Sequence, residues 1–420
     1  PEYRAIAFTL KSILVSAQTA SGKTLIAVLA MINHLSSKKG KIVYLSPLRA
    51  LAAEKFSEFQ QLEYVDFGRK IRAQISTGDF DNADKNLEKS DIIVLTNEKM
   101  DSLIRHGAEW LDDVSLVIVD EVHLLGDRDR GPTLEIVLTK LKLLQQKPQI
   151  LALSATVTNA KEISSWIGCD LVESDWRPVP LWEGVYDGGT VRMQNGEKFE
   201  VETSMRGPSV DLGIDSIKDG GQTILFAETR ARSATLAAKA ADVVGKSLDE
   251  DEKNELDKIS QQILEGNEHT DLVKNLATLI KKGVAFHHAG LNQKCRETIE
   301  SEFRNGKIKL LASTPTLAAG VNLPARRVVI SSINRYDAKF GANKPISILE
   351  YKQLCGRAGR PQYDKFGEAI IVGNSNSDEL IDYYVNGTPE PILSKLTDDR
   401  ALRTHILSLV STSPGIKKEE

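Results

Sequence analysis

Short apolar runs alternate with longer amphipathic stretches along roughly the first 175 residues of the chain. Runs such as Leu116–Val119 are apolar at every position, so they predict strands buried on both faces of a parallel sheet, with helices between them. The predicted strands are Ser12–Ala17, Lys41–Ser46, Asp91–Thr96, Ser115–Asp120 and Gln149–Ser154. The predicted helices are Thr24–Leu35, Arg49–Phe59 and Thr133–Leu144.

The pattern breaks at residues 174–208, where Pro and Gly cluster, and this segment predicts a linker with a hairpin. A second alternation of strands and helices follows, so the chain predicts two tandem α/β domains. The strands predicted there are Thr223–Ala227, Val284–His287, Ile308–Ser313 and Arg327–Ser332, and the helices are Arg230–Val244 and Gln293–Asn305. The highly charged residues 245–282 predict one or two exposed helices, and a third, helical region begins near Pro391.

Composition narrows the class of protein. A chain of 420 residues exceeds what one hydrophobic core usually supports, and 41% hydrophobic with 27% charged residues is typical of a soluble globular protein. Because the net charge is -4, any nucleic-acid site must be a local basic channel. Cys169, Cys295 and Cys355 form no CxxC pair, which favours a reducing, intracellular location over a disulfide framework or zinc site. No uncharged run approaches the roughly 20 residues that span a bilayer, so we expect no membrane partner.

The segment AQTASGKT, residues 17–24, follows a predicted strand and opens a predicted helix. In that context successive backbone N–H groups and the positive end of the helix dipole can bind phosphates. We expect Lys23 to reach the β- and γ-phosphates of a nucleotide and Thr24 to bind Mg²⁺. Ala17 replaces the usual first glycine of this loop. The other phosphate-binding candidates are Thr19, Ala20, Ser21 and Gly22.

Acidic residues end the predicted strand Ser115–Asp120, which lies about 95 residues beyond the segment AQTASGKT. Asp120 and Glu121 stand where a carboxylate points into the ligand crevice of an open α/β sheet. We expect Asp120 to hold Mg²⁺, and Glu121 to orient and deprotonate the attacking water. The tripeptide SAT, residues 154–156, ends another strand and predicts a link between the γ-phosphate site and domain closure.

The segment YKQLCGRAGR, residues 351–360, places two arginines three residues apart between glycines. Because guanidinium groups match phosphate oxygens and stay charged, Arg357 and Arg360 are candidate arginine fingers. Upstream, residues 313–324 follow a strand and are rich in small residues, which allows a backbone to approach a ligand closely.

Taken in order, these segments resemble the superfamily 2 helicases, specifically the DExH-box, Ski-two-like group. The segments that match are AQTASGKT, SPLRALAAEK, TNEKMDSL, DEVH, SAT, ILFAETRARS, FHHAGL, STPTLAAGVNLPAR and QLCGRAGRPQYDKFGEAIIV. Together with RPVPLWEGV in the linker, the residues of these segments resemble in particular those of the archaeal Hjm-type DNA repair helicases.

The resemblance implies an ATP-dependent 3′-to-5′ helicase built from two RecA-like domains, which uses ATP and Mg²⁺ and acts on single-stranded and forked DNA. His123 and Gln353 join the catalytic set, and Gly320 and Asn322 would lie near the ribose, although Asn322 stands where related helicases often carry Asp. Residues implied to hold the DNA backbone are Ser46, Pro47, Arg49, Thr96, Glu98, His288, Gly290 and Thr314.

The resemblance also implies domain boundaries. Residues 1–175 form the ATP-binding domain, residues 176–390 the second RecA-like domain, and residues 391–420 the start of a winged-helix domain. Residues 331–350 match the family's strand-separating hairpin. Its Asn334, Arg335, Tyr336 and Phe340 either act as a wedge or form a surface hairpin that packs its aromatic residues on the second domain. No glutamine-centred adenine motif is found in residues 1–12. The family continues beyond residue 420, so we expect a fragment.

Two other interpretations remain open at this point. The first is an RNA helicase of the same group, since motors that grip the backbone make few base contacts. The second is a nucleotide-gated nucleic-acid clamp that does not unwind, against which the intact Lys23, Asp120, Glu121, Arg357 and Arg360 argue. For the helicase we expect a monomer that is cytoplasmic in a prokaryote, as in an archaeon, and nuclear in a eukaryote.

Overall fold

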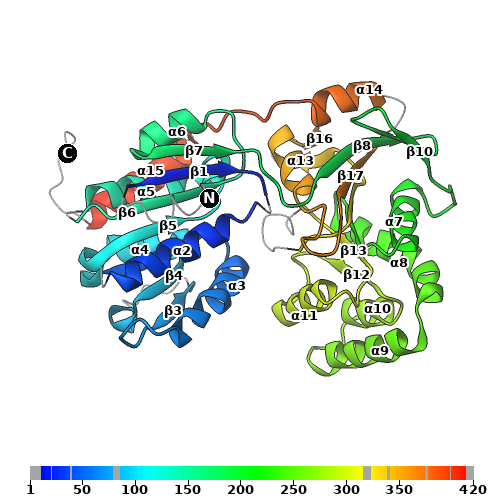
Figure 1. Ribbon diagram of the computed structural model, residues 1–420, viewed down its shortest axis with the longest axis horizontal. Coiled ribbons are helices and arrows are strands. Elements are labelled where there is room, and N and C mark those ends of the chain that lie inside the picture. Colours follow the sequence, from blue (N-terminus) through cyan, green and yellow to red (C-terminus); the bar gives the residue numbers. More distant parts are fainter. Residues whose placement is uncertain are drawn as a thin grey trace. The chain divides into compact units, whose positions relative to one another are not determined.

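The protein is described here from a computed structural model. The described residues are 11–19, 21–37, 40–78, 86–144, 146–315, 323–337, 341–373, 377–397 and 399–412. They divide into two compact units, which are treated one at a time (Figure 1). Unit 1 comprises Pro1–Trp176 with Glu390–Glu420, and unit 2 comprises Arg177–Pro389.

Unit 1 contains a parallel sheet of seven strands in the order β3-β4-β2-β5-β6-β1-β7. Its strands are β1 (Ile13–Ala17), β2 (Lys41–Ser46), β3 (Ala73–Ser76), β4 (Ile92–Thr96), β5 (Val114–Val119), β6 (Gln149–Ser154) and β7 (Asp170–Ser174). Its helices are α2 (Lys23–Ser36), α3 (Arg49–Phe59), α4 (Asn97–Arg105), α5 (Gly131–Leu143), α6 (Ala160–Ile167) and α15 (Asp399–Thr412).

The alternation of side chains along these strands explains why their sequences are apolar throughout. Ile42 and Tyr44 of β2 belong to a core cluster that also contains Met31 of α2 and Phe59 of α3. Val43, between them, is equally buried but lies on the opposite face, because successive strand residues point to opposite sides. Helices α4 and α6 contact the sheet as well. The predicted doubly covered parallel sheet is therefore confirmed.

Unit 2 contains an eight-stranded sheet in the order β10-β9-β8-β17-β14-β11-β13-β12, parallel from β8 to β12 and antiparallel at the β8–β9–β10 edge. Its strands are β8 (Leu181–Asp187), β9 (Thr190–Met193), β10 (Lys198–Glu200), β11 (Thr223–Phe226), β12 (Val284–His287), β13 (Leu310–Ser313), β14 (Arg327–Ile330) and β17 (Gly367–Val372). A separate hairpin joins β15 (Asn334–Asp337) to β16 (Ala342–Pro345). Its helices are α7 (Pro208–Lys218), α8 (Arg230–Ser247), α9 (Glu250–Glu265), α10 (Asp271–Ile280), α11 (Gln293–Arg304), α13 (Ile348–Cys355) and α14 (Ser377–Leu380).

The prediction that residues 174–208 are mainly a linker is wrong, although the hairpin within them is confirmed. Strand β8 pairs in parallel with β17 inside the main sheet of unit 2, and the β8–β9 hairpin extends that sheet. Pro and Gly residues marked the turns correctly but hid the strand that ends in the buried Val185 and Tyr186.

The prediction of exposed helices in residues 245–282 is half right. Two helices form there, and α9 and α10 pack side by side at the lower end of unit 2 in Figure 1. Each buries one apolar face, as Leu256 and Ile263 of α9 and Leu276 and Ile280 of α10 show. The many charges cover only the outer faces, so composition overstated the exposure.

Helix α15 supplies the helical region predicted after Pro391. It contacts α4 and α5 and belongs to unit 1. Upstream of it, Asn159 donates a hydrogen bond to the carbonyl of Ile392 at 2.9 Å and accepts one from its N–H at 2.9 Å. Among the described residues, no helix is both long and apolar enough to cross a membrane.

Candidate active site

The carboxyl ends of the parallel strands of unit 1 bring the predicted nucleotide-binding residues to one edge of the sheet. Ser16 of β1 is the register partner of Ser154 of β6, and Val119 of β5 is the partner of Ala152 of β6. The loop after β1, the tripeptide after β6 and the acidic residues after β5 therefore leave the sheet as neighbours. Ligands bind at this edge in open α/β sheets.

The loop after β1 turns sharply into α2. Gly22 has φ +87, a left-handed conformation that glycine adopts without strain. The Lys23 ammonium folds back over the loop and donates to the carbonyls of Ala17 at 2.8 Å and Gln18 at 2.9 Å. This places a positive charge and the N-terminus of α2 together, as a phosphate site requires.

Asp120 lies one residue beyond β5, although its N–H still bonds the carbonyl of Leu45 at 3.0 Å. Its carboxylate accepts a 2.5 Å hydrogen bond from the hydroxyl of the buried Tyr44 and another from the N–H of Glu121 at 3.0 Å. Burial, and then the charge of Glu121, raise the pKa of Asp120 to about 6, while Tyr44, Lys55 and Lys23 oppose that shift. A cation bound here would relieve the crowding of the two carboxylates.

Glu121 has φ +55, which is uncommon for a residue other than glycine. Such conformations persist only where the surrounding structure holds them, and they cluster at functional sites. The Glu121 side chain is 29% exposed, so it can still meet solvent.

His123 links the acidic segment to the end of β6. Its Nδ1 accepts a hydrogen bond from the N–H of Ala155 at 3.1 Å. Burial, and then the charge of Lys23, lower the pKa of His123 to about 4. The ring is therefore neutral at pH 7, and its 3.3 Å approach to Glu121 is not an ion pair. The hydrogen bond from Ala155 to His123 joins the segment DEVH, residues 120–123, to SAT, residues 154–156, inside unit 1.

Lys55 was missed by sequence reasoning. It lies on α3, is 7% exposed, and donates to the Thr24 hydroxyl at 3.1 Å and to Glu58 at 3.0 Å. Its charge also acts on Asp120. A lysine within a predicted helix is usually solvated, so only the fold shows that Lys55 reaches the predicted metal ligand.

Three buried hydroxyls at this edge support a polar ligand. Within the described part of unit 1, the Oγ atoms of Ser16, Ser21 and Ser154 have no hydrogen-bond partner. Buried polar groups are nearly always paired, so an unpaired set points to a missing ligand, ion or water. Thr24 and Asp120 supply oxygens of the kind that Mg²⁺ accepts beside nucleotide phosphates. The residues present therefore fit a magnesium–nucleotide complex.

The same edge continues along β2 and β4 with the predicted DNA-binding residues. Ser46 and Thr96 are buried, and their hydroxyls serve the fold: Ser46 donates to Leu48, and Thr96 accepts from the N–H of Lys99 at the start of α4. Pro47 is buried as well, whereas Arg49 and Glu98 are exposed. A carboxylate repels phosphate, so Arg49 is the better candidate of the two exposed residues.

In unit 2 the predicted DNA-binding residues also lie at carboxyl ends, after β12 and β13. The Nδ1 atom of His288 accepts the N–H of Gly290 at 3.1 Å, and the N–H of Thr314 bonds the carbonyl of His287 at 3.3 Å. Burial, and then the charge of Arg230, lower the pKa of His288. The exposed Arg230, which begins α8, is a second basic residue that sequence reasoning did not single out.

The arginine turn, residues 356–360, lies at the opposite, amino-terminal edge of this sheet. Arg357 is buried, and Ala325, just before β14, bonds its carbonyl at 2.9 Å. Arg360 pairs with Asp364 through two nitrogens and donates to Gln222, which precedes β11. Gln353 is half-buried on α13. Arg360 is thus held within unit 2 and would have to release Asp364 to reach a phosphate.

Comparison with known proteins identifies the family. The profile described as DEAD/DEAH box helicase matches residues 3–163, and the helicase conserved C-terminal domain matches residues 209–362. The chain belongs to the DEAD/DEAH box helicases. It is 46% identical over 407 residues to the ATP-dependent DNA helicase Hel308 of Methanocella arvoryzae, covering 96% of this chain and 54% of that protein. It is 42% identical over 403 residues to Hel308 of Pyrococcus abyssi, covering 96% and 54%.

The chain therefore spans about half the length of these curated helicases. The resemblance to the Ski-two-like DNA helicases that the motifs predicted is confirmed, as is the fold of two RecA-like α/β domains. Four predicted residues of this helicase, Ala20, Gly320, Asn322 and Phe340, lie outside the described residues.

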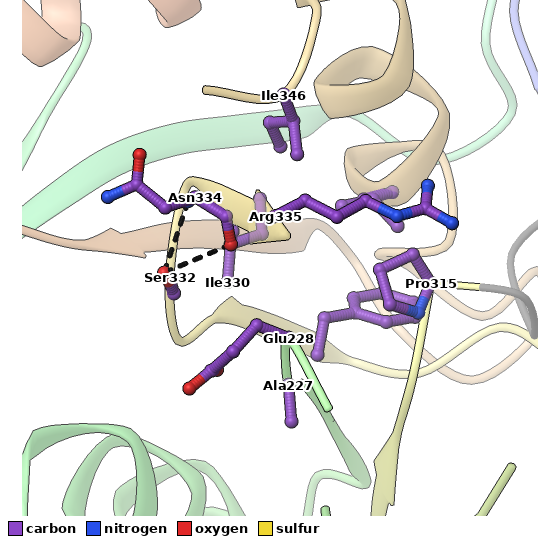
Figure 2. A pocket seen from close by; sticks show the side chains of 10 residues that line it. Ala227, Glu228, Pro315, Ile330, Ser332, Asn334, Arg335 and Ile346 are labelled. Carbon is purple, nitrogen blue, oxygen red and sulfur yellow. Dashed lines mark hydrogen bonds between the residues drawn. The ribbon is translucent and has the colours of Figure 1, made fainter. Parts of the chain in front are cut away.

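The hairpin predicted in residues 331–350 of this helicase is present as β15 and β16. At its foot, Ser332 and Asn334 hydrogen-bond, and Arg335 extends along a small pocket beside Pro315 (Figure 2). The pocket also borders Glu228, two residues after β11, and its volume of about 10 Å³ holds no more than roughly one water molecule. The hairpin is thus anchored on the carboxyl edge of unit 2, where Thr314 lies.

Proposed function

We propose that this chain is the ATP-driven motor of a DNA helicase that moves 3′-to-5′ along single-stranded DNA. The observation that carries the proposal is the cluster at the carboxyl edge of unit 1. There Lys23, Asp120 and Glu121 meet, and the His123–Ala155 hydrogen bond ties the acidic segment to the next strand. The relatives named ATP-dependent DNA helicase support the choice of DNA.

In this proposal Lys23 binds the β- and γ-phosphates, while the N–H groups of residues 17–24 surround them. Thr24 and Asp120 hold Mg²⁺, which neutralises charge that develops on the phosphates. Glu121 orients and deprotonates the attacking water, because its side chain is 29% exposed and can meet solvent. His123 ties the acidic segment to the end of β6, because its Nδ1 accepts the N–H of Ala155.

Arg357 supplies positive charge to the transferred phosphate, with Gln353 orienting water or phosphate beside it. Arg360 serves first to brace the turn through Asp364 and contacts phosphate only after that pair opens. Gly320 and Asn322 complete the nucleotide site at the ribose. These assignments rest on motif position and on the geometry of each unit taken alone.

The DNA strand follows the carboxyl edges, along Ser46, Pro47, Arg49, Thr96 and Glu98 in unit 1 and His288, Gly290 and Thr314 in unit 2. Arg49 is exposed in the first of these segments, and the exposed Arg230 begins α8 after the carboxyl end of β11. Contacts to phosphates carry no sequence information, so the motor acts on many sequences, and binding weakens steeply with salt.

The β15–β16 hairpin separates strands at a fork, because it rises from the same edge and its described β16 residues are exposed. Residues 391–420 open a winged-helix domain in this proposal. We further propose that the protein is a cytoplasmic, monomeric enzyme of DNA repair.

ATP hydrolysis tests the proposal, measured for the chain alone, with single-stranded DNA, and with RNA of the same sequence. We expect DNA to stimulate hydrolysis more than RNA, and Lys23→Ala to remove the activity and so exclude a contaminant. Equal or greater stimulation by RNA would assign the chain to RNA processing. Nucleotide binding with no stimulation by either polymer would favour a clamp.

A further inference from the structure

The turn that carries Arg357 is held on one side by the segment before β14. The N–H of Ala325 donates to the carbonyl of Arg357 at 2.9 Å, and the N–H of Gly359 donates to the carbonyl of Ala325 at 2.6 Å. These bonds form a parallel bridge between Ala325 and Ala358. One flank of the arginine is therefore fixed through its backbone.

The other flank is held by Arg177, a residue that the proposed mechanism does not use. Its Nε donates to the carbonyl of Val179 at 2.9 Å, and its Nη2 donates to the carbonyls of Gly356, at 3.3 Å, and Ala358. The last two residues stand immediately before and after Arg357. A guanidinium has several donors in a rigid plane, so one side chain can fix both carbonyls at once.

The residues after Arg177 close the same contact by packing. A Cβ added to Gly359, which has φ +89, would lie 2.7 Å from Cγ1 of the buried Val179. The carbonyl of Pro180 accepts the N–H of Gly367, the first residue of β17, at 2.8 Å. Residues 177–180 and the arginine turn thus form one continuous, hydrogen-bonded block.

We propose that Arg177 is the positioning residue for Arg357: it fixes the two carbonyls that flank Arg357 and so aims that guanidinium at the transferred phosphate. Arg177 is also the first residue of unit 2, directly after Trp176 of unit 1. The chain therefore enters unit 2 at a residue bonded to the arginine turn, which ties any movement of that entry segment to Arg357. The inference rests on the proposed role of Arg357.

A double-mutant cycle on the 420-residue chain tests this. DNA-stimulated kcat and KM for ATP are measured for Arg177→Ala, Arg177→Lys, Arg357→Ala and the double variant, with each kcat referred to the fraction that binds a fluorescent nucleotide. Arg192→Ala is the matched control, because Arg192 pairs with Asp378 in the same unit and touches no part of the turn in its described contacts. Circular-dichroism melting reports the fold of every variant.

We expect Arg177→Ala to lower kcat about 100-fold with KM within threefold, since a displacement of about 1 Å can cost that much. Arg177→Lys should recover part of the loss, and Arg192→Ala should leave kcat unchanged. In the Arg357→Ala background, Arg177→Ala should cause no further loss, because the group that it positions is gone.

Two results would overturn the inference. If Arg177→Ala keeps kcat within twofold while Arg357→Ala loses it, Arg177 has no positioning role and the proposed function stands. If the losses of the two single variants multiply in the double variant, Arg177 acts through general stability. If Arg357→Ala itself remains active, the role proposed for Arg357 fails instead.

Discussion

The two units use the edges of their sheets differently. In unit 1 all the candidate residues follow carboxyl ends of parallel strands: Lys23 and Asp120 for the nucleotide, and Arg49 for the DNA. In unit 2 the candidate DNA-binding residues Thr314 and His288 lie at carboxyl ends of strands, whereas the arginine turn lies at the amino-terminal edge of the sheet.

Helix α13 explains the difference. The chain leaves β14 at the carboxyl edge, forms the hairpin, and returns along α13 to begin β17 at the amino edge. Arg357 follows the end of α13, so it reaches the edge opposite to the hairpin. A substitution in the arginine turn should therefore alter hydrolysis without altering strand binding, whereas in unit 1 the two functions share one edge.

The largest expected effect belongs to the nucleotide side of unit 1. Glu121→Gln keeps the shape of the side chain but removes the base, so we expect kcat for ATP to fall about 10³-fold. Nucleotide and DNA affinities, measured by fluorescence anisotropy, should stay within threefold. Near-normal turnover in this variant would show that Glu121 is not the base.

Gly359→Ala separates the amino edge of unit 2 from its carboxyl edge. The added Cβ would clash with Val179 at a positive φ, so we expect the turn to shift and kcat to fall about 30-fold. The control is Gly220→Ala, where φ is also positive, at +77, but nothing lies within 4 Å. Both should lower the melting temperature by about 3 °C, and neither should change DNA affinity. Weaker DNA binding in Gly359→Ala alone would contradict the separation of the two edges.

Lys55→Met examines how α3 contributes to the nucleotide site of unit 1. Removing the ammonium beside Thr24 and Asp120 takes away attraction for phosphates and competition for the metal. We expect affinity for ATP without metal to fall about tenfold, and the Mg²⁺ concentration for half-maximal hydrolysis to fall as well. Lys55→Arg, which keeps the charge, should change both quantities less. Titrations with EDTA and with added Mg²⁺ measure them, and no change in either would make Lys55 a structural residue only.

Sequence patterns predicted the buried strands well, because a strand covered on both faces must be apolar at every position. Strands β2, β6 and β12 begin and end where they were expected. The patterns failed at β8, whose flanking Pro and Gly residues indicated a linker, and at β3, where Ala73 to Ser76 are mostly half-buried and carry no strong signal.

The candidate site divides in the same way. A local segment such as AQTASGKT contains its phosphate-binding residues within a few positions of one another, so Lys23 and Thr24 could be predicted from the sequence. Lys55, Tyr44 and Arg177 could not, because each acts on a residue far away along the chain: Tyr44 on Asp120, Lys55 on Thr24 and Arg177 on the arginine turn. Such contacts depend on which strands are neighbours, and spacing alone does not reveal that.

Arg49→Ala and Arg230→Ala give the smallest effect and the sharpest comparison of the two carboxyl edges. Each removes one exposed cation, so we expect affinity for single-stranded DNA to fall about fivefold and the salt slope to decrease by about one, equally for unrelated sequences. The losses should multiply in the double variant, since the residues belong to different units. Lys365→Ala, which removes an exposed cation after the arginine turn, is the control and should leave DNA affinity unchanged. If Lys365→Ala weakens DNA binding as much as Arg230→Ala does, the DNA does not distinguish the two edges of the sheet in unit 2. Net charge, rather than the topology of the sheet, would then govern where the DNA binds.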